Sequence, residues 1–474
     1  MPHIMPHGPL DQAIISLAAE NVDFYARISI LLIQEDDLPI ALEYTERGRG
    51  ILSRDELRSQ PVDFRGNLDD QTLLLEEETL RLAVLEAQNL VDALNRDLNT
   101  ADQAKQDAQA ALEDAQDTYD RHIERMQLQG GFLSRELALD VASLEEIQVA
   151  LPDDTTLLLY GINPVGSYAL LVTANDLRGF TLDAGTDQID EAVRRFATDR
   201  RANADALRDL YDLVFAPITN EITTSHLIIS PDGVLNYVPF AALQAPDGHY
   251  LIDDYAISMI PSGTTLVLLK DRQNTPAIQP ILAMSQRSAP PLPALTHADS
   301  EVRIIADLFQ MEAVTNATEA DLRTQLAGRG ILHISAHAEL NPFAPLYSVI
   351  HLAPDEAGQY DGRLEVREIY ELDLSATELV ILSGCDTRSG GDGEDFGLIN
   401  RAFFGAGAQK VVSSLWSVDD EATAMLLTAF MEARLSGTYS NDADALQAAM
   451  IKIKDLYPDQ PYYWASFVLT GLPD

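Results

Sequence analysis

The sequence predicts an α/β protein in which an all-helical region precedes the sheet-forming part. Residues 67–129 contain neither glycine nor proline, which favours a long helix over turns. After Leu151, uninterrupted aliphatic segments alternate with segments of helical period. Aliphatic runs without polar alternation are typical of strands covered on both faces, as in parallel sheets.

Charge and composition narrow the class of function. The chain of 474 residues has a net charge of −43 and is long enough for two or three domains. Its surface would repel phosphates, so we expect no direct nucleic-acid binding; cationic partners, solubility and adaptation to salt all fit. The single cysteine excludes a disulfide framework. Without a signal peptide or an apolar run of membrane-spanning length, the sequence predicts a cytoplasmic protein.

The N-terminal part has helical patterns throughout. Residues 9–57 have the pattern of two amphipathic helices. From Leu80 to Tyr119, apolar residues recur at the 4-3 spacing of a coiled coil. The sequence TADQ at 100–103 could instead cap a second helix and give a hairpin. We expect a helical support that packs on the rest of the chain in preference to a dimerising coil.

Two α/β units follow. In the first we expect strands over 155–162, 166–176 and 225–230 with a helix over 189–218, and then a proline-rich linker or exposed loop over 276–293. In the second, aliphatic runs predict strands over 280–285, 331–336, 378–383 and 410–416. Helical periods there cover residues 297–310, 396–405 and 419–435.

Two of these predicted strands end in residues that can do chemistry. His337 follows one aliphatic run and Cys385 follows another, and open parallel sheets place their chemistry at such strand ends. A thiol beside an imidazole can act as a nucleophile with a base, although a lone cysteine is also a common core residue. His333 and His337 are too far apart on a strand, about 13 Å, to share one metal ion. We therefore interpret His333 as a core histidine with a hydrogen-bonded partner.

The C-terminal two-thirds, roughly residues 140–474, resembles the CHAT family of caspase-related cysteine peptidases, which commonly follow tetratricopeptide repeats. The resemblance is carried by "ILHISAHAELNPFAPLYSVIHLA", "GRLEVREIYELDLSATELVILSGCDT", "GLINRAFFGAGAQKVVSSLWSVDDEATAMLLTAF" and "PYYWASFVLTG". Upstream, "LIISPDGVLNYVPFAAL" and "DDYAISMIPSGTTLVLL" resemble the preceding half of the same module, which in separases is a non-catalytic copy of the caspase-like fold.

The resemblance implies a caspase-like module, with a non-catalytic half and an active half, behind an all-α helical and coiled-coil region. The domains it implies are tetratricopeptide-like helices at 1–66, a long helix or coiled-coil hairpin at 67–140, the non-catalytic half at 141–277 and the catalytic half at 278–474.

The resemblance also assigns roles to individual residues. His337 becomes the general base or acid and Cys385 the nucleophile; the two are 48 residues apart, close to the spacing of about 50 in caspases. The amides of Ala338 and Cys385 would form the oxyanion hole, although the family usually has glycine where this chain has Ala338. Candidate substrate-binding residues are Ser414, Leu415, Trp416, Asp419 and Asp386. Trp416 could equally be a core aromatic, and Asp419 a helix cap.

The function implied is a cysteine endopeptidase that cuts a protein substrate without a metal or other cofactor. Its N-terminal helices would bind a regulatory protein or hold the enzyme inactive. The alternative is a catalytically inactive caspase-like scaffold that recruits partner proteins.

Overall fold

The computed structural model describes residues 22–58, 141–164, 166–198, 204–272, 276–290, 292–339, 348–355, 360–386, 394–416 and 419–473, together with isolated helical positions between 80 and 118. Side chains are described for most of these residues; for Cys385 and Asp386 the structure describes the backbone. The predicted coiled coil at 67–140 lies for the most part outside the described residues, although Ala108 and Leu112 of the predicted apolar seam are buried.

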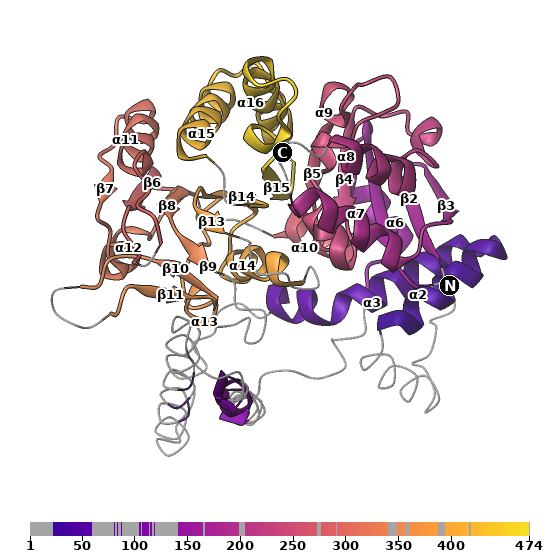
Figure 1. Ribbon diagram of the computed structural model, residues 1–474, viewed down its shortest axis with the longest axis horizontal. Helices are drawn as coiled ribbons and strands as arrows, with labels where there is room; N and C mark the ends of the chain where they lie inside the picture. The colour runs from indigo at the N-terminus through magenta and orange to yellow at the C-terminus, as the bar shows by residue number, and fades with distance from the viewer. Residues whose placement is uncertain are drawn as a thin grey trace.

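An eleven-stranded sheet forms the centre of the molecule, in the order β3-β2-β1-β4-β5-β15-β14-β12-β8-β6-β7 (Figure 1). Its strands are β1 (Thr155–Gly161), β2 (Ser167–Thr173), β3 (Asp176–Leu182), β4 (His226–Ser230), β5 (Ala256–Met259), β6 (Gln279–Gln286), β7 (Val314–Thr315), β8 (Arg329–Ala336), β12 (Leu379–Leu382), β14 (Lys410–Ser414) and β15 (Phe467–Gly471).

The sheet joins an earlier and a later part of the chain. The strands β1 to β5 meet the later strands where β5 pairs in parallel with β15, with Met259 opposite Thr470. On the far side of β15, the strands β14, β12, β8, β6 and β7 all run parallel. One continuous sheet therefore passes through both α/β units.

Both faces of this sheet are covered by helices. In β12, Val380 and Leu382 belong to one core cluster, whereas Leu379 and Ile381 belong to another. Because both faces of the strand are buried, its sequence is continuously apolar and does not alternate with polar residues. The helices are α2 (Val22–Gln34), α3 (Leu38–Arg58), α6 (Leu144–Ala150), α7 (Thr186–Thr198), α8 (Ala204–Leu210), α9 (Leu251–Asp254), α10 (Gly263–Asp271), α11 (Ala298–Leu308), α12 (Glu319–Gln325), α13 (Val366–Ile369), α14 (Glu394–Gly405), α15 (Asp420–Leu435) and α16 (Asp442–Leu456).

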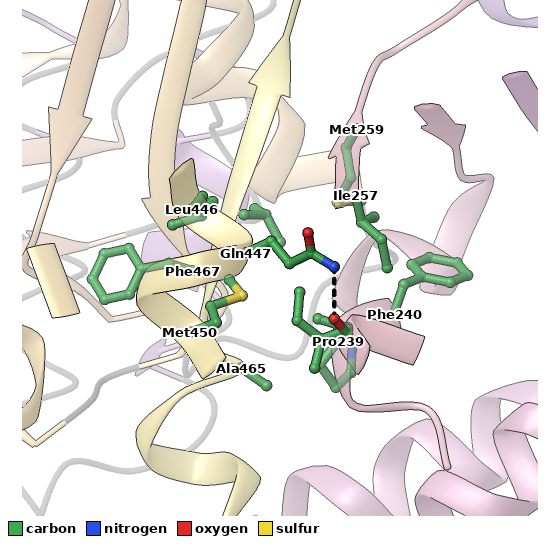
Figure 2. A pocket seen from close by; sticks show the side chains of 12 residues that line it. Pro239, Phe240, Ile257, Met259, Leu446, Gln447, Met450, Ala465 and Phe467 are labelled. Atoms are coloured by element: carbon green, nitrogen blue, oxygen red, sulfur yellow. Dashed lines mark hydrogen bonds between the residues drawn. The ribbon is translucent and has the colours of Figure 1, made fainter. Parts of the chain in front are cut away.

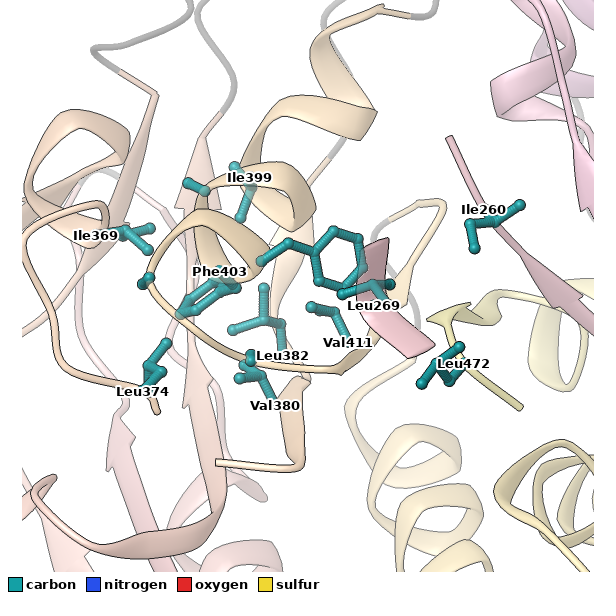
Figure 3. Packing of buried hydrophobic residues seen from close by; sticks show 14 of the residues in the cluster. Ile260, Leu269, Ile369, Leu374, Val380, Leu382, Ile399, Phe403, Val411 and Leu472 are labelled. Atoms are coloured by element: carbon teal, nitrogen blue, oxygen red, sulfur yellow. The ribbon is translucent and has the colours of Figure 1, made fainter. Parts of the chain in front are cut away.

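The helix α14 anchors one of these faces. Its residues Ile399 and Phe403 lie beside Val380 and Leu382 of β12 in the cluster drawn in Figure 3. Leu269 of α10 belongs to the same cluster, so the first helix after the candidate nucleophile shares a core with the earlier part of the chain.

A second sheet of four short strands extends from the end of the first. Its order is β11-β10-β9-β13, with β9 (Ala338–Glu339), β10 (Val349–His351), β11 (Arg363–Glu365) and β13 (Cys385–Asp386). The strands β9 and β13 continue directly from β8 and β12 of the large sheet. This small sheet was not predicted from the sequence.

The helical arm of α2 and α3 docks on the sheet-forming part through a buried carboxylate. Glu46 of α3 accepts hydrogen bonds from the amides of Gly263 and Thr264, at 2.8 and 2.6 Å, and from the Thr264 hydroxyl at 2.6 Å. These groups form the first turn of α10, whose free amides favour a negative charge. The arm therefore supplies acceptors for two amides at the N-terminus of α10, beside its N-cap residue Ser262.

The predicted class, an α/β sheet protein with a helical N-terminal region, is confirmed. The predicted helix over 189–218 is wrong as one element, because α7 and α8 pack against each other and a π-helical turn follows at Tyr211–Phe215; residues 199–203 lie outside the described residues. The strand β3 was not predicted. None of the described helices is long and apolar enough to cross a membrane.

A small apolar pocket lies at the seam between the earlier and later strands (Figure 2). Its lining includes Phe240 and Ile257 from one side and Met450 and Phe467 from the other. The Gln447 side chain crosses the seam and donates a hydrogen bond of 2.8 Å to the carbonyl of Ile252. A volume of about 20 Å³ has room for a single water molecule, so the pocket is a packing defect of the seam and too small for a ligand.

Candidate active site

The backbone brings His337 and Cys385 to the same edge of the large sheet. The strands β8 and β12 are parallel neighbours, with Ile334 opposite Leu382, so their carboxyl ends meet. Beyond these ends, Ala338 pairs with Cys385 in the small sheet. Paired strands lie about 5 Å apart, so the residue after the histidine faces the cysteine across one strand spacing.

Gly384 makes this approach feasible. A Cβ atom on Gly384 would lie 1.9 Å from the Ala336 carbonyl oxygen and 2.5 Å from its carbon. Both are backbone atoms of β8, so neither can rotate away. Close contact with the segment that precedes His337 therefore requires a glycine before the candidate nucleophile.

The ring of His337 is fixed by a backbone carbonyl. Its Nε2 atom lies 2.7 Å from the Pro293 oxygen, and the side chain is 8% exposed. A carbonyl oxygen only accepts, so Nε2 carries the proton and donates it in this bond. In the neutral ring Nδ1 is then the acceptor nitrogen, which is the form that a general base needs.

The loop that contains Pro293 is itself anchored. The Asp420 carboxylate, at the start of α15, accepts hydrogen bonds from the Thr296 hydroxyl at 2.9 Å and the His297 amide at 2.6 Å. Leu295 donates its amide to the Arg287 carbonyl at 3.0 Å within the loop. The proline-rich stretch was predicted as a linker or exposed loop; Pro290 and Pro293 are exposed, and the Pro293 carbonyl also supports the candidate histidine.

Ala338 has an ordinary strand conformation. It belongs to β9 and pairs with Ile350 as well as Cys385, and its φ is not in the left-handed region that favours glycine. An alanine is therefore accommodated without backbone strain. Its amide donates to the Gly384 carbonyl at 3.3 Å, a length at the weak end for such a bond.

Three of the candidate substrate-binding residues are buried. Ser414, Leu415 and Trp416 have at most 1% exposure. The Trp416 indole donates to the Tyr462 carbonyl at 3.2 Å, and its ring lies 5.5 Å from that of Phe196. The structure thus places Trp416 in the core, between the later and earlier parts of the chain.

The two acidic candidates occupy different places. Asp419 caps α15, with its carboxylate accepting from the amides of Glu421 and Ala422 at 3.2 and 3.1 Å. The backbone of Asp386 pairs with that of Glu339 in the small sheet, directly beyond Cys385 and Ala338. The Glu339 carboxylate is 2.7 Å from Nε2 of His351.

Three carboxylates interact with one another near the small sheet: Glu319 at the start of α12, Glu365 at the end of β11 and Glu368 in α13. Desolvation by burial, reinforced by the charge of Glu368, raises the pKa of Glu319 to about 7, against the bonds that it accepts from Arg323. Burial also raises the pKa of Glu365 and of Glu368, while Arg367 opposes the shift in both. The raised pKa of Glu319 is thus linked to α13 through the charge of Glu368.

The described residues contain no cluster of three or more His, Cys, Asp or Glu side chains that could hold a metal ion. His333 is fully buried and its Nε2 lies 2.8 Å from Oε1 of Glu301. This is the hydrogen-bonded core position expected from the sequence.

Sequence reasoning missed Glu301 and the Pro293 carbonyl. Glu301 lies among Ala298, Val302 and Ile305 on the buried face of α11. A single acid at core positions of a predicted helix was the signal that could have found it. The Pro293 carbonyl is a backbone atom, and nothing in the side-chain pattern indicates it.

The comparison with protein families assigns the later part of the chain. A CHAT domain model matches residues 204–472, more than half of the sequence. The chain belongs to the CHAT domain family. The matched range contains both His337 and Cys385, whereas the helical arm of α2 and α3 lies outside it.

Slightly more than half of this CHAT chain is similar in sequence to curated relatives. It is 24% identical over 321 residues to tetratricopeptide repeat protein 28 of Homo sapiens, covering 56% of this chain and 13% of that protein. The Mus musculus protein of the same name is 24% identical over 339 residues, covering 57% and 14%. The chain therefore spans about one-seventh of the length of these relatives.

Solved structures overlay on the CHAT chain with TM-scores below 0.5. The separase of a Saccharomyces cerevisiae separase–securin complex gives a TM-score of 0.45 at 11% identity, covering 98% of this chain and 40% of that one. The Arg-specific cysteine proteinase gingipain R gives 0.38 at 9% identity, covering 61% and 74%.

Proposed function

We propose that this CHAT protein is a cysteine endopeptidase that cuts a protein substrate, with Cys385 as nucleophile and His337 as base. The observation that carries the proposal is the backbone pairing of Cys385 with Ala338, which sets the thiol-bearing and imidazole-bearing residues at one sheet edge. The Nε2–Pro293 bond supports it, because it leaves Nδ1 of His337 free to accept a proton.

The proposed reaction follows from these groups. Nδ1 of His337 takes the thiol proton, and the sulfur attacks the carbonyl carbon of the scissile peptide bond. As the carbon–nitrogen bond breaks, the leaving amine takes that proton from the imidazolium. Water then cleaves the thioester, which releases the new carboxyl end and restores the thiol. The backbone amides of Cys385 and Ala338 would stabilise the oxyanion.

The geometry of Ala338 makes this a regulated site in our proposal. Its amide donates to Gly384 and must leave that weak bond before it can serve an oxyanion. Activation would come through the helical arm or a protein partner, because α3 packs against both α10 and α14 and the latter follows the nucleophile segment. We keep Ser414, Leu415, Trp416, Asp386 and Asp419 as proposed contacts of a substrate bound in the activated form.

The alternative is a catalytically inactive scaffold that recruits other proteins. The hydrogen bond from the Ala338 amide to the Gly384 carbonyl favours this alternative. If the amide never leaves that bond, the site lacks one of its two oxyanion donors.

One experiment separates the two functions. The wild-type chain, Cys385→Ala and His337→Ala are each expressed in the same cells, and new protein N-termini are identified across the proteome. We expect a set of termini in the wild type that is lost with either substitution, since a general base contributes about 10²- to 10⁴-fold to the rate. Identical termini from all three proteins, with partner binding retained, would support the scaffold.

A further inference from the structure

A buried carboxylate joins the two strands that precede the proposed dyad in the chain. Glu301 of α11 is 1% exposed. Its Oε1 atom accepts a hydrogen bond of 2.6 Å from the Ser383 hydroxyl and another of 2.8 Å from Nε2 of His333. His333 lies in β8, and Ser383 follows the last residue of β12.

The position of this cluster relates it to the candidate site. His333 is four residues before His337 in the chain, and Ser383 is two residues before Cys385. Oε1 of Glu301 thus bonds to both chain segments, a few residues before the base in one and the nucleophile in the other. The loop before α11, the helix that contains Glu301, supplies the Pro293 carbonyl that holds the His337 ring.

This cluster packs a helix on a sheet at a higher cost in free energy than apolar side chains would. The neighbouring contacts of α11 are apolar, through Val302, Ile305 and Ala306. A buried carboxylate is unfavourable unless it is well paired, and among the described residues Oε2 of Glu301 and Nδ1 of His333 have no hydrogen-bond partner. Apolar residues of similar volume would fill this place at lower cost, whereas a hydrogen-bonded carboxylate also fixes distances and directions.

We infer that Glu301 is a positioning residue for the dyad, which sets the spacing of the β8 and β12 ends through His333 and Ser383. The inference rests on the proposed function. Loss of the Ser383 bond would let the Cys385 backbone move relative to His337, and the thiolate would be held less well.

Cys385 offers a direct readout because it is the only cysteine in the chain. The rate of its alkylation by iodoacetamide is measured between pH 5 and 10 on the whole protein. The variants are Ser383→Ala, which removes the hydroxyl alone, Ser383→Thr, which restores a hydroxyl, and Glu301→Gln. The matched control is Ser167→Ala, since Ser167 is also buried, in β2, and donates a bond of 2.7 Å to the Ala184 carbonyl, away from the site.

We expect Ser383→Ala to slow alkylation at pH 7 by about three- to tenfold, the worth of one buried hydrogen bond, and to move the midpoint of the pH profile upward. Ser383→Thr should recover most of the wild-type profile, and Ser167→Ala should leave it unchanged. If Ser383→Ala lowers the melting temperature but keeps the wild-type profile, the cluster is structural and the inference is wrong. Should Glu301→Gln fail to fold, the two Ser383 variants decide the question.

His337→Ala in the same assay distinguishes the two proposals. If this substitution moves the pH profile of alkylation to that of an ordinary thiol, with a midpoint of about 8.5, the dyad stands. The Ser383 variants then test the role of Glu301 alone. If His337→Ala leaves the profile unchanged, the proposed dyad fails and the role of Glu301 fails with it.

Discussion

Two small residues at the candidate site have opposite tolerance for a side chain. Gly384 touches the backbone of Ala336, so even a methyl group has no room. Ala338 already carries a methyl group, and its strand conformation accommodates it. The need for glycine at this edge therefore comes from contact between two chain segments and not from a special backbone angle at the residue after the histidine.

This contrast gives a paired prediction. Gly384→Ala should destabilise the protein by about 1–3 kcal/mol, because an overpacked site must shift backbone. It should also abolish selective reactivity of Cys385, since the β9–β13 pairing has to open. Ala338→Gly should cost no more than about 1 kcal/mol, from the added flexibility of the unfolded chain. Urea unfolding and alkylation measure both effects; equal losses in the two variants would contradict this account.

Glu319 predicts a pH dependence of stability. Its pKa is raised from 4.5 to about 7 in the folded protein, first by desolvation. A carboxyl of this kind favours the folded state while protonated, so its contribution is complete below pH 4.5 and is lost as the pH rises through 7. The side chain is 1% exposed, and the loss is on the order of 3 kcal/mol.

Glu319→Gln tests this, because an amide cannot ionise. Between pH 5 and 8 the free energy of unfolding should fall less steeply for the variant than for the wild type. The control is Glu371→Gln, which alters a half-exposed carboxylate 4.0 Å from the same Arg323. If the two substitutions flatten the pH dependence equally, the buried position of Glu319 is not its cause.

Among the elements, the arm helix α3 has the most specific attachment. Glu46 caps α10 through three hydrogen bonds, and Ile147 of α6 lies close to the same turn, where a Cβ on Gly263 would be 2.6 Å from its Cδ1. The Glu46 carboxylate and the amides of α10 satisfy one another's hydrogen bonds, so removing one of them leaves the other with buried unpaired groups.

Glu46→Ala should therefore loosen α10 as well as the arm. Leaving two buried amides unpaired, and the Thr264 hydroxyl with only the bond that it accepts from the Ala142 amide, is expected to cost about 3–5 kcal/mol. Hydrogen exchange of the Gly263 and Thr264 amides should rise by orders of magnitude. Glu43→Ala, on the same helix at a partly exposed position, should leave this exchange unchanged; faster exchange there would indicate that the whole arm is merely unstable.

The sequence predicted the continuous aliphatic strands well, but it predicted neither the division of the expected helix over 189–218 nor the strands of two residues. The strands β8 and β12 were predictable because Ile331, Ile334 and their neighbours form runs that need cover on two faces. The strands β9 and β13 contain two residues each, too few for any period to be visible. For the candidate site, the ends of aliphatic strands indicated His337 and Cys385, whereas contacts between distant segments, such as Pro293 with His337, have no local pattern.

At the scale of the whole molecule, the two α/β units are held together by polar contacts as well as by the sheet. His226 of β4 lies 2.7 Å from Asp444 of α16, and Gln447 bonds across the seam. In the later part, Lys410 is buried between Asp442 and Glu378, at 2.6 and 2.9 Å, and Arg434 bonds to both carboxylates. These pairs are local, and they offset only a small part of the chain's charge.

The remaining charge predicts how salt affects the fold. A net charge of −43 is close to one excess negative charge per eleven residues, and its self-repulsion favours expanded states. Salt shortens the range of this repulsion from about 30 Å at 0.01 M to about 10 Å at 0.1 M, whereas the buried Lys410 pairs are screened far less. We therefore expect the melting temperature at pH 7.5 to rise steeply with NaCl up to about 0.3 M and then to level off. KCl should give the same curve, because screening depends on ionic strength and not on the identity of the cation. A steady rise beyond 1 M would point to salt exclusion from the surface, and a fall below 0.3 M would mean that attractive surface pairs outweigh the net charge.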